Sequence, residues 1–133
     1  MRKIEHIGIA VKDMQAATQI YSSLLGCTHY KTEEVLGEGV NTAFFTCGES
    51  KIELLEATTQ DSAIAKFIAK KGEGVHHIAF AVDDINAEVQ RLEKEGFVVL
   101  NPEPKIGADN KWVVFLHPKS SSGVLVELCQ ERN

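Results

Sequence analysis

Two histidines and two glutamates stand at matching places in a sequence that repeats itself. His6 begins the run HIGIAVKDMQAA and His77 begins the related run HIAFAVDDINAE, with six of the twelve residues identical. A glutamate followed by leucine comes 47 residues after the first histidine and 50 residues after the second, at Glu53 and Glu127. Two imidazoles and two carboxylates can together bind a divalent metal ion of borderline softness. The chemistry that this pattern indicates is therefore metal-based.

Glu127 gives the strongest single indication, because it interrupts the apolar run Val124–Leu128. A carboxylate buried there would be costly unless it were paired, metal-bound or hydrated. Taken one at a time, each of the four residues is better explained as structural, either a satisfied core histidine or a solvated glutamate. The duplication favours a metal site for the set. Four protein ligands of an octahedral ion would leave two positions for substrate oxygens.

The residues around each histidine predict the strand that positions it. In residues 3–12, bulky and small side chains alternate, so a strand would have one bulky face and one face of small residues beside the histidine. The second copy repeats this alternation. We therefore expect the bulky face to pack on a helix and the small face to line a cup. The bulky residues are Ile7, Ile9 and Val11, then Ile78, Phe80 and Val82.

Helix signals follow each of these strands. Asp13 is a plausible N-cap for a helix over residues 14–25, and Asp84 for a helix over residues 85–95. A further helix, capped near Asp61 or Ser62, is expected to end near residue 71. The remaining strands are predicted at residues 27–35, 40–47 and 51–57 in the first half, and at residues 97–100, 111–117 and 123–130 in the second.

Each half therefore has the order β-α-β-β-β. A half of about 60 residues would leave sheet edges open and would not close a core alone. We expect an α+β fold with two tandem βαβββ modules that form a curved eight-stranded sheet around a metal-centred cup. The domain is predicted to span residues 1–133, with module 1 at about 1–57, a linking helix at about 58–73 and module 2 at about 74–133.

Composition limits the classes of partner. A net charge of −5 argues against a nucleic-acid-binding surface, and no stretch approaches the ~18 apolar residues of a membrane span. The three cysteines form no CxxC pair and are predicted to be reduced, mostly buried thiols without a chemical role. We therefore expect a cytoplasmic protein that binds a small molecule and neither nucleic acid nor membrane.

Several segments together resemble the vicinal oxygen chelate (glyoxalase/bleomycin resistance) superfamily, and within it the methylmalonyl-CoA epimerases. The resemblance covers essentially the whole chain, and its most specific part is the ending FLHPK followed by GVLVEL. The other segments that carry it are IEHIGIAV at residues 4–11, DSAIAKFI at 61–68, GVHHIAF at 74–80 and EPKIGA at 103–108.

The resemblance implies a metal-dependent isomerase and its ligands. By position, the metal ligands would be His6, Glu53, His77 and Glu127, and Glu127 would also transfer a proton. The implied ion is Co²⁺ or Mn²⁺, with Zn²⁺ or Ni²⁺ as alternatives. The implied reaction interconverts (R)- and (S)-methylmalonyl-CoA by metal-assisted proton transfer at C2 through an enolate. The resemblance also implies a homodimer with an acyl-CoA substrate.

Two other functions remain open for a chain with this pattern. Glyoxalase I of the nickel type has the same four ligand types and acts on a methylglyoxal hemithioacetal. Its usual Asp-Pro-Asp-Gly-like turn is absent here, where HPKSSSG precedes the last strand. The second of these hypotheses is a metal-free protein of the same fold that binds a small molecule. One departure concerns the second acid–base group, because some bacterial epimerases carry a glutamate at the position of Thr42.

Overall fold

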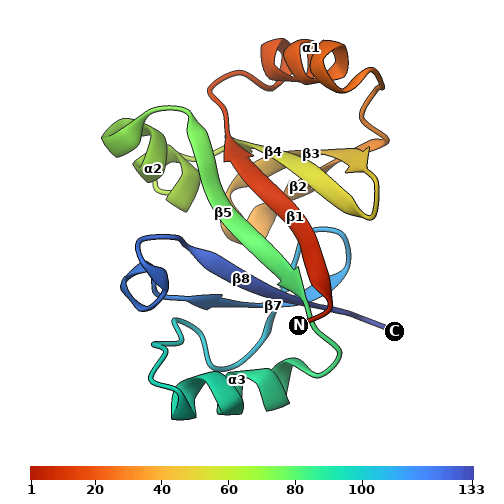
Figure 1. Ribbon diagram of the computed structural model, residues 1–133. Coiled ribbons are helices and arrows are strands. Elements are labelled where there is room, and N and C mark those ends of the chain that lie inside the picture. The colour runs from red at the N-terminus through yellow and green to blue at the C-terminus, as the bar shows by residue number, and fades with distance from the viewer. The chain divides into compact units, whose positions relative to one another are not determined.

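The computed structural model describes residues 1–133 and contains eight strands and three α-helices. Figure 1 shows their arrangement, in which one helix follows β1, one follows β4 and one follows β5. The helices are α1 (Met14–Leu25), α2 (Ala63–Lys71) and α3 (Ile85–Lys94). None of them is long and apolar enough to cross a membrane. The strands are β1 (Lys3–Ala10), β2 (Lys31–Val35), β3 (Val40–Cys47), β4 (Ser50–Ala57), β5 (Gly74–Ala81), β6 (Lys105–Gly107), β7 (Lys111–Leu116) and β8 (Val126–Glu131).

The chain divides into two compact units, which are described separately. The N-terminal unit comprises His6–His76, and the C-terminal unit comprises His77–Asn133 together with Met1–Glu5. Strand β1 therefore begins in one unit and continues in the other. Helix α2, expected as a link between modules, belongs to the N-terminal unit. A single domain over residues 1–133 stays a prediction.

In the N-terminal unit the strands lie in the order β2-β3-β4-β1, with β1 parallel to β4 and the other pairs antiparallel. Helix α1 covers the bulky face of this sheet, where Ala17 packs with Phe45 and Leu54. Helix α2 covers one end of the opposite face, where Ile64 packs with Val40 and Leu55. The rest of that opposite face carries His6 and is called here the His–Glu face of the unit.

The C-terminal unit repeats this plan with the strand order β5-β8-β7-β6. Helix α3 covers the bulky face through Ile85, Val89 and Leu92, which form one cluster with Val114 and Leu128. The opposite face, the His–Glu face of this unit, carries a small apolar cluster of Ala79, Val113 and Cys129 with Phe115 against it. Together the two units confirm the predicted α+β class with two βαβββ modules.

The predicted helix starts are confirmed by their caps. The Asp13 carboxylate accepts a hydrogen bond from the Ala16 amide, and the Asp84 carboxylate accepts one from the Ala87 amide. Each bond satisfies a backbone donor that the first helical turn leaves without a partner. The linking helix is capped by the Ser62 hydroxyl, which accepts from the Ala65 amide. Of the two caps considered for that helix, Ser62 is the one used.

The strand prediction was wrong in two ways. β2 and β8 begin later than predicted, at Lys31 rather than at residue 27 and at Val126 rather than at residue 123. Residues 97–100 form only an isolated bridge, between Val99 and Leu116. The side chain of Asn101 explains the second error, because it accepts from the Phe115 amide at 2.8 Å and donates to the Val113 carbonyl at 3.2 Å. A side-chain amide thus occupies backbone groups of β7 that a longer strand would use.

The edge strand of the C-terminal unit, β6, was missed by the sequence analysis. It has only three residues and pairs with β7 so that Gly107 lies opposite Lys111. A side chain at Gly107 would place its Cβ 2.9 Å from a Val113 methyl carbon, closer than carbon atoms can approach. Glycine is therefore required for β6 to lie this close to β7.

Candidate metal centre

The first His–Glu pair lies on the parallel strands β1 and β4 of the N-terminal unit. Gly8 is opposite Glu53 in the ladder, and His6 is two residues earlier on the same face. Because Gly8 has no side chain, the carboxylate can reach back along β1 to the imidazole. The His6 Nδ1 to Glu53 Oε2 distance is 3.1 Å, and both residues are at least 95% buried.

The second pair repeats this arrangement on β5 and β8 of the C-terminal unit. Ala79 is opposite Glu127, and His77 is two residues earlier on the same face. The His77 Nε2 to Glu127 Oε1 distance is 3.2 Å, and both side chains are buried. The structure thus brings together each predicted histidine with the predicted glutamate of its own half. The prediction that all four bind one ion stays a prediction.

A phenylalanine flanks each glutamate on its other side, which the sequence analysis did not predict. Phe44 of β3 is opposite Glu53, and Phe115 of β7 is opposite Glu127. The Phe115 ring also meets the His77 ring edge to face, with 6.0 Å between centroids. Each carboxylate is therefore bordered by a small residue and an aromatic ring. The offset of 71 residues that relates the histidines also relates the two phenylalanines, and this signal could have identified them.

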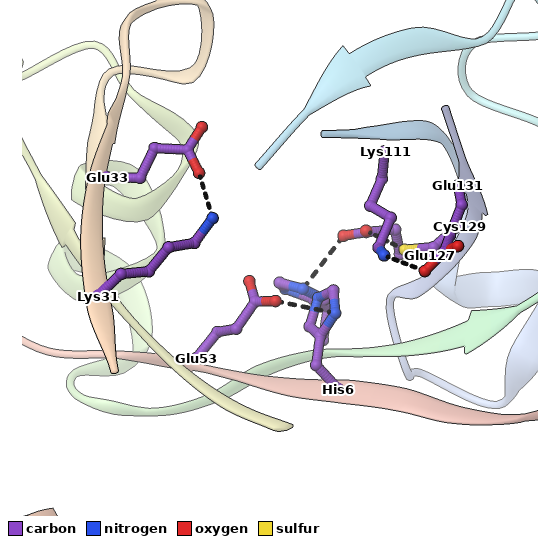
Figure 2. Close-up of polar contacts among 9 residues, drawn as sticks. His6, Lys31, Glu33, Glu53, Lys111, Glu127, Cys129 and Glu131 are labelled. Atoms are coloured by element: carbon purple, nitrogen blue, oxygen red, sulfur yellow. Dashed lines mark hydrogen bonds and ion pairs between the residues drawn. The ribbon is translucent and has the colours of Figure 1, made fainter. Parts of the chain in front are cut away.

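A lysine lies over each of these rings from the outer strand of its unit. The Lys31 Nζ atom of β2 is 4.8 Å from the centre of the Phe44 ring, and the Lys105 Nζ atom of β6 is 5.6 Å from that of Phe115. Cations at this distance from an aromatic face are attracted by its electron density. Lys31 also pairs with Glu33 at 3.7 Å, one of the contacts drawn in Figure 2.

The two pairs differ in what holds the glutamate. The Cys129 thiol donates a hydrogen bond of 2.7 Å to Glu127 Oε2, as Figure 2 shows, so Glu127 binds a thiol through one oxygen and faces His77 through the other. Leu55 occupies the matching place beyond Glu53 and has no donor in its side chain. The prediction of mostly buried thiols was wrong, because Cys27 and Cys47 are exposed and only Cys129 is buried.

The residues present fit a divalent metal ion. Two ligand atoms at about 2.1 Å from an ion, at right angles to each other, are roughly 3.0 Å apart. The nitrogen-to-oxygen distances of 3.1 and 3.2 Å in the two pairs are close to this value. Each pair offers one imidazole nitrogen and one carboxylate oxygen from residues that are almost fully buried. Such donors suit Mn²⁺, Co²⁺, Ni²⁺ or Zn²⁺ better than the all-oxygen coordination that Ca²⁺ prefers.

Comparison with known proteins identifies the family. Residues 5–115 match the glyoxalase/bleomycin resistance protein/dioxygenase superfamily. The chain is 43% identical over 129 residues to mitochondrial methylmalonyl-CoA epimerase of Homo sapiens. The aligned region covers 96% of this chain and 73% of the human protein. The chain belongs to the methylmalonyl-CoA epimerase family. The resemblance inferred from the sequence is therefore confirmed.

Two further members of the methylmalonyl-CoA epimerase family match nearly the whole chain. Ethylmalonyl-CoA/methylmalonyl-CoA epimerase of Cereibacter sphaeroides is 43% identical, with 96% of this chain and 97% of that protein covered. The structure of a Streptomyces coelicolor methylmalonyl-CoA epimerase variant with 2-nitronate-propionyl-CoA is 39% identical in sequence and has a TM-score of 0.92. The match covers 98% of this chain and 95% of the Streptomyces chain. Family and structure thus agree on the vicinal oxygen chelate fold.

Proposed function

We propose that this protein interconverts (R)- and (S)-methylmalonyl-CoA by metal-assisted proton transfer at C2 through an enolate. The observation that carries the proposal is the duplicated His–Glu pair, buried and in the same register in both units of a chain from the epimerase family. The human relative is named for this substrate, and the Cereibacter sphaeroides relative is named for it and its ethyl homologue. Both 2-alkylmalonyl thioesters are therefore candidate substrates.

We infer that His6, Glu53, His77 and Glu127 bind one divalent ion, Co²⁺ or Mn²⁺, with Zn²⁺ or Ni²⁺ as alternatives. Three observations support this set: the four donors are buried, the nitrogen-to-oxygen distance within each pair suits neighbouring positions on an ion, and the pair occurs in both units. A divalent ion bound there would stabilise the negative charge that develops on substrate oxygens when the C2 proton leaves.

The surroundings of the carboxylates suit proton transfer at an acidic carbon. The C2 carbon of the substrate is bonded to a thioester carbonyl and to a carboxylate. Removal of its proton therefore gives an enolate whose charge is delocalised. Glu127 is proposed to exchange a proton with C2, and the Cys129 thiol restricts the rotation of its carboxylate through the bond to Oε2. The aromatic rings of Phe44 and Phe115 border the two glutamates and limit the access of water to them.

We also propose a cytoplasmic homodimer. The exposed thiols of Cys27 and Cys47 support a reducing compartment, where such groups persist. The dimer is what the resemblance to the superfamily implies. Sedimentation equilibrium tests the dimer, and fractionation of the source cells tests the location.

The proposed function is tested by solvent exchange. Metal-loaded protein is incubated in D₂O with (S)-methylmalonyl-CoA, and deuterium at C2 is followed together with formation of the (R) form. We expect incorporation of deuterium and interconversion, both abolished by a chelator and restored by the divalent ion. Absence of exchange, alongside rapid turnover of a methylglyoxal hemithioacetal, would overturn the epimerase in favour of the glyoxalase reading. The metal-free binding protein is disfavoured because two buried carboxylates would weaken an apolar binding site.

A further inference from the structure

Inversion at C2 needs a group on each face of the carbon, one that takes a proton and one that returns it. Glu127 is proposed for one of these roles, which leaves the second without a residue. The strand register of the N-terminal unit shows which side chains share the His–Glu face. Across β2, β3 and β4, the side chains on this face include two carboxylates, those of Glu53 and Glu33. Glu53 is already proposed as a metal ligand.

Glu33 is placed on this face by β2. Glu33 lies opposite Thr42 of β3, and Thr42 lies opposite Leu55 of β4. Leu55 follows Glu53 by two residues, so all of these side chains are on one face of the sheet. Burial along β2 alternates, with Lys31 and Glu33 half-buried and Thr32 exposed. Figure 2 shows the Lys31 and Glu33 side chains extending from β2 toward the side on which Glu53 lies. The Glu33 carboxylate is therefore on the same face as the first His–Glu pair and remains accessible to a small molecule.

Lys31 fixes the position of the Glu33 carboxylate. The Lys31 Nζ atom is 3.7 Å from Glu33 Oε1 and 4.8 Å from the centre of the Phe44 ring. Because the ammonium group contacts both partners, it holds the carboxylate beside the ring that borders Glu53. The Glu33 side chain is 35% exposed, so bound substrate could exclude the remaining water from it.

We propose that Glu33 is the second acid–base group, an assignment that rests on the proposed epimerase function. In one direction the C2–H bond breaks, its electron pair enters the enolate, and an O–H bond forms on the Glu33 carboxylate. In the other direction that O–H bond breaks and the proton goes to C2. No oxidant or reductant is needed, and the group on the other face completes the inversion.

Two other carboxylates near these sheets, Glu131 and Glu34, fit this role less well. Glu131 of β8 is 78% exposed in its side chain and pairs with the buried Lys111 at 3.2 Å, at the end of the strand away from His77. Glu34 follows Glu33 but is exposed on the opposite face of β2. Glu33 differs from both because it combines partial burial with a neighbouring cation on the His–Glu face.

The test uses the two enantiomers separately in D₂O with the metal-loaded Glu33→Gln variant. A protein with two proton-transfer groups exchanges each enantiomer through the group that faces its C2 proton. We expect Glu33→Gln to lose exchange from one enantiomer by about 10²-fold or more and to lose inversion to the same extent. Exchange from the other enantiomer and the metal content should stay close to those of the unaltered protein. A merely structural role would not separate the enantiomers in this way.

Glu34→Gln is the matched control, because it removes the same charge from the adjacent residue on the other face. It should invert both enantiomers at the rate of the unaltered protein. Full inversion by Glu33→Gln, or equal loss of exchange from both enantiomers, overturns the assignment. If the unaltered protein exchanges neither enantiomer, the proposed function itself fails, and the assignment fails with it. Selective loss with Glu34→Gln and not with Glu33→Gln would also overturn it.

Discussion

The two His–Glu pairs share one backbone design and differ in their supports. In each pair the glutamate is opposite a small residue, Gly8 or Ala79, and the histidine is two residues earlier. Beyond Glu53, the face continues to Leu55 under helix α2. Beyond Glu127, it continues to the Cys129 thiol, which binds the carboxylate directly. The duplication has therefore kept the donors and changed what holds them.

Because of this difference, the two glutamates need not contribute equally to metal binding, although their positions in the strand ladders are equivalent. A hydrogen bond from a buried thiol restricts the rotation of the Glu127 carboxylate. The matching leucine beside Glu53 can only pack against it. Removing a hydrogen bond to a group that binds a metal typically changes metal affinity or activity by about 10–100-fold. We therefore expect the Glu127 half to be the more sensitive half of the site.

The largest effect is expected from exchanging each glutamate for its amide. Glu127→Gln should lose metal and C2 exchange together, by about 10³-fold in rate, because it removes both a ligand charge and the proposed proton carrier. Glu53→Gln should retain exchange with weaker metal binding, since an amide oxygen can still bind an ion. Metal content and deuterium incorporation measure the difference. Full metal occupancy and full activity in Glu127→Gln would contradict its assignment as a ligand.

A smaller effect should follow from removing the thiol. Cys129→Val keeps a side chain of similar size but removes the donor to Glu127 Oε2, so metal affinity should fall by about tenfold. Leu55→Val is the matched change in the other half. It should cost about 1 kcal/mol in stability and leave metal affinity unchanged. Titration of metal into both variants is the measurement, and equal affinities would mean that the thiol does not support the site.

The smallest effect concerns the two equivalent helices. In α3 the Arg91 guanidinium donates to Glu88 at 3.0 Å and holds the pKa of that carboxyl below its ordinary value of 4.5. Helix α1 has Ala17 and Ile20 at the matching positions. Because the folded-state pKa is lowered, the contribution to stability exists above pH 4.5 and is lost as pH falls through the lowered value.

Glu88→Gln should therefore lower the melting temperature by roughly one degree at neutral pH and by less in acid. Arg91→Gln removes the other partner and should lower the melting temperature similarly. Thermal unfolding followed at several pH values measures both variants. A deficit that grew toward acid pH would show that another interaction of Glu88 is responsible.

The repeat made much of the fold predictable from the sequence. Asp13 and Asp84 cap their helices through bonds to residues three positions later, so the local sequence was sufficient. The two histidines and two glutamates were identified from matching strand positions, although the sequence predicted them as one set of four and not as a pair in each half. The α+β class followed from the order of elements in both halves.

The remaining features depend on contacts between distant residues. Asn101 replaces a strand by binding β7 through its side chain, and no local pattern distinguishes that from an ordinary turn residue. The thiol bond of Cys129 could not be predicted, because it depends on how the carboxylate two residues earlier turns. Glu33 was overlooked since its place on the face depends on its register with Thr42.

Strand β1 has a consequence for the order in which the protein can form during synthesis. Just after its end, the Val11 amide donates to the Leu55 carbonyl at 2.9 Å, whereas near its start the Arg2 amide donates to the Ala81 carbonyl at 2.8 Å. Residue 55 leaves the ribosome well before residue 81. The later part of β1 can therefore pair while its beginning still waits for a partner, and closing the longer loop carries the higher entropic cost. The first residues to be made in this strand are the last in it to find their place.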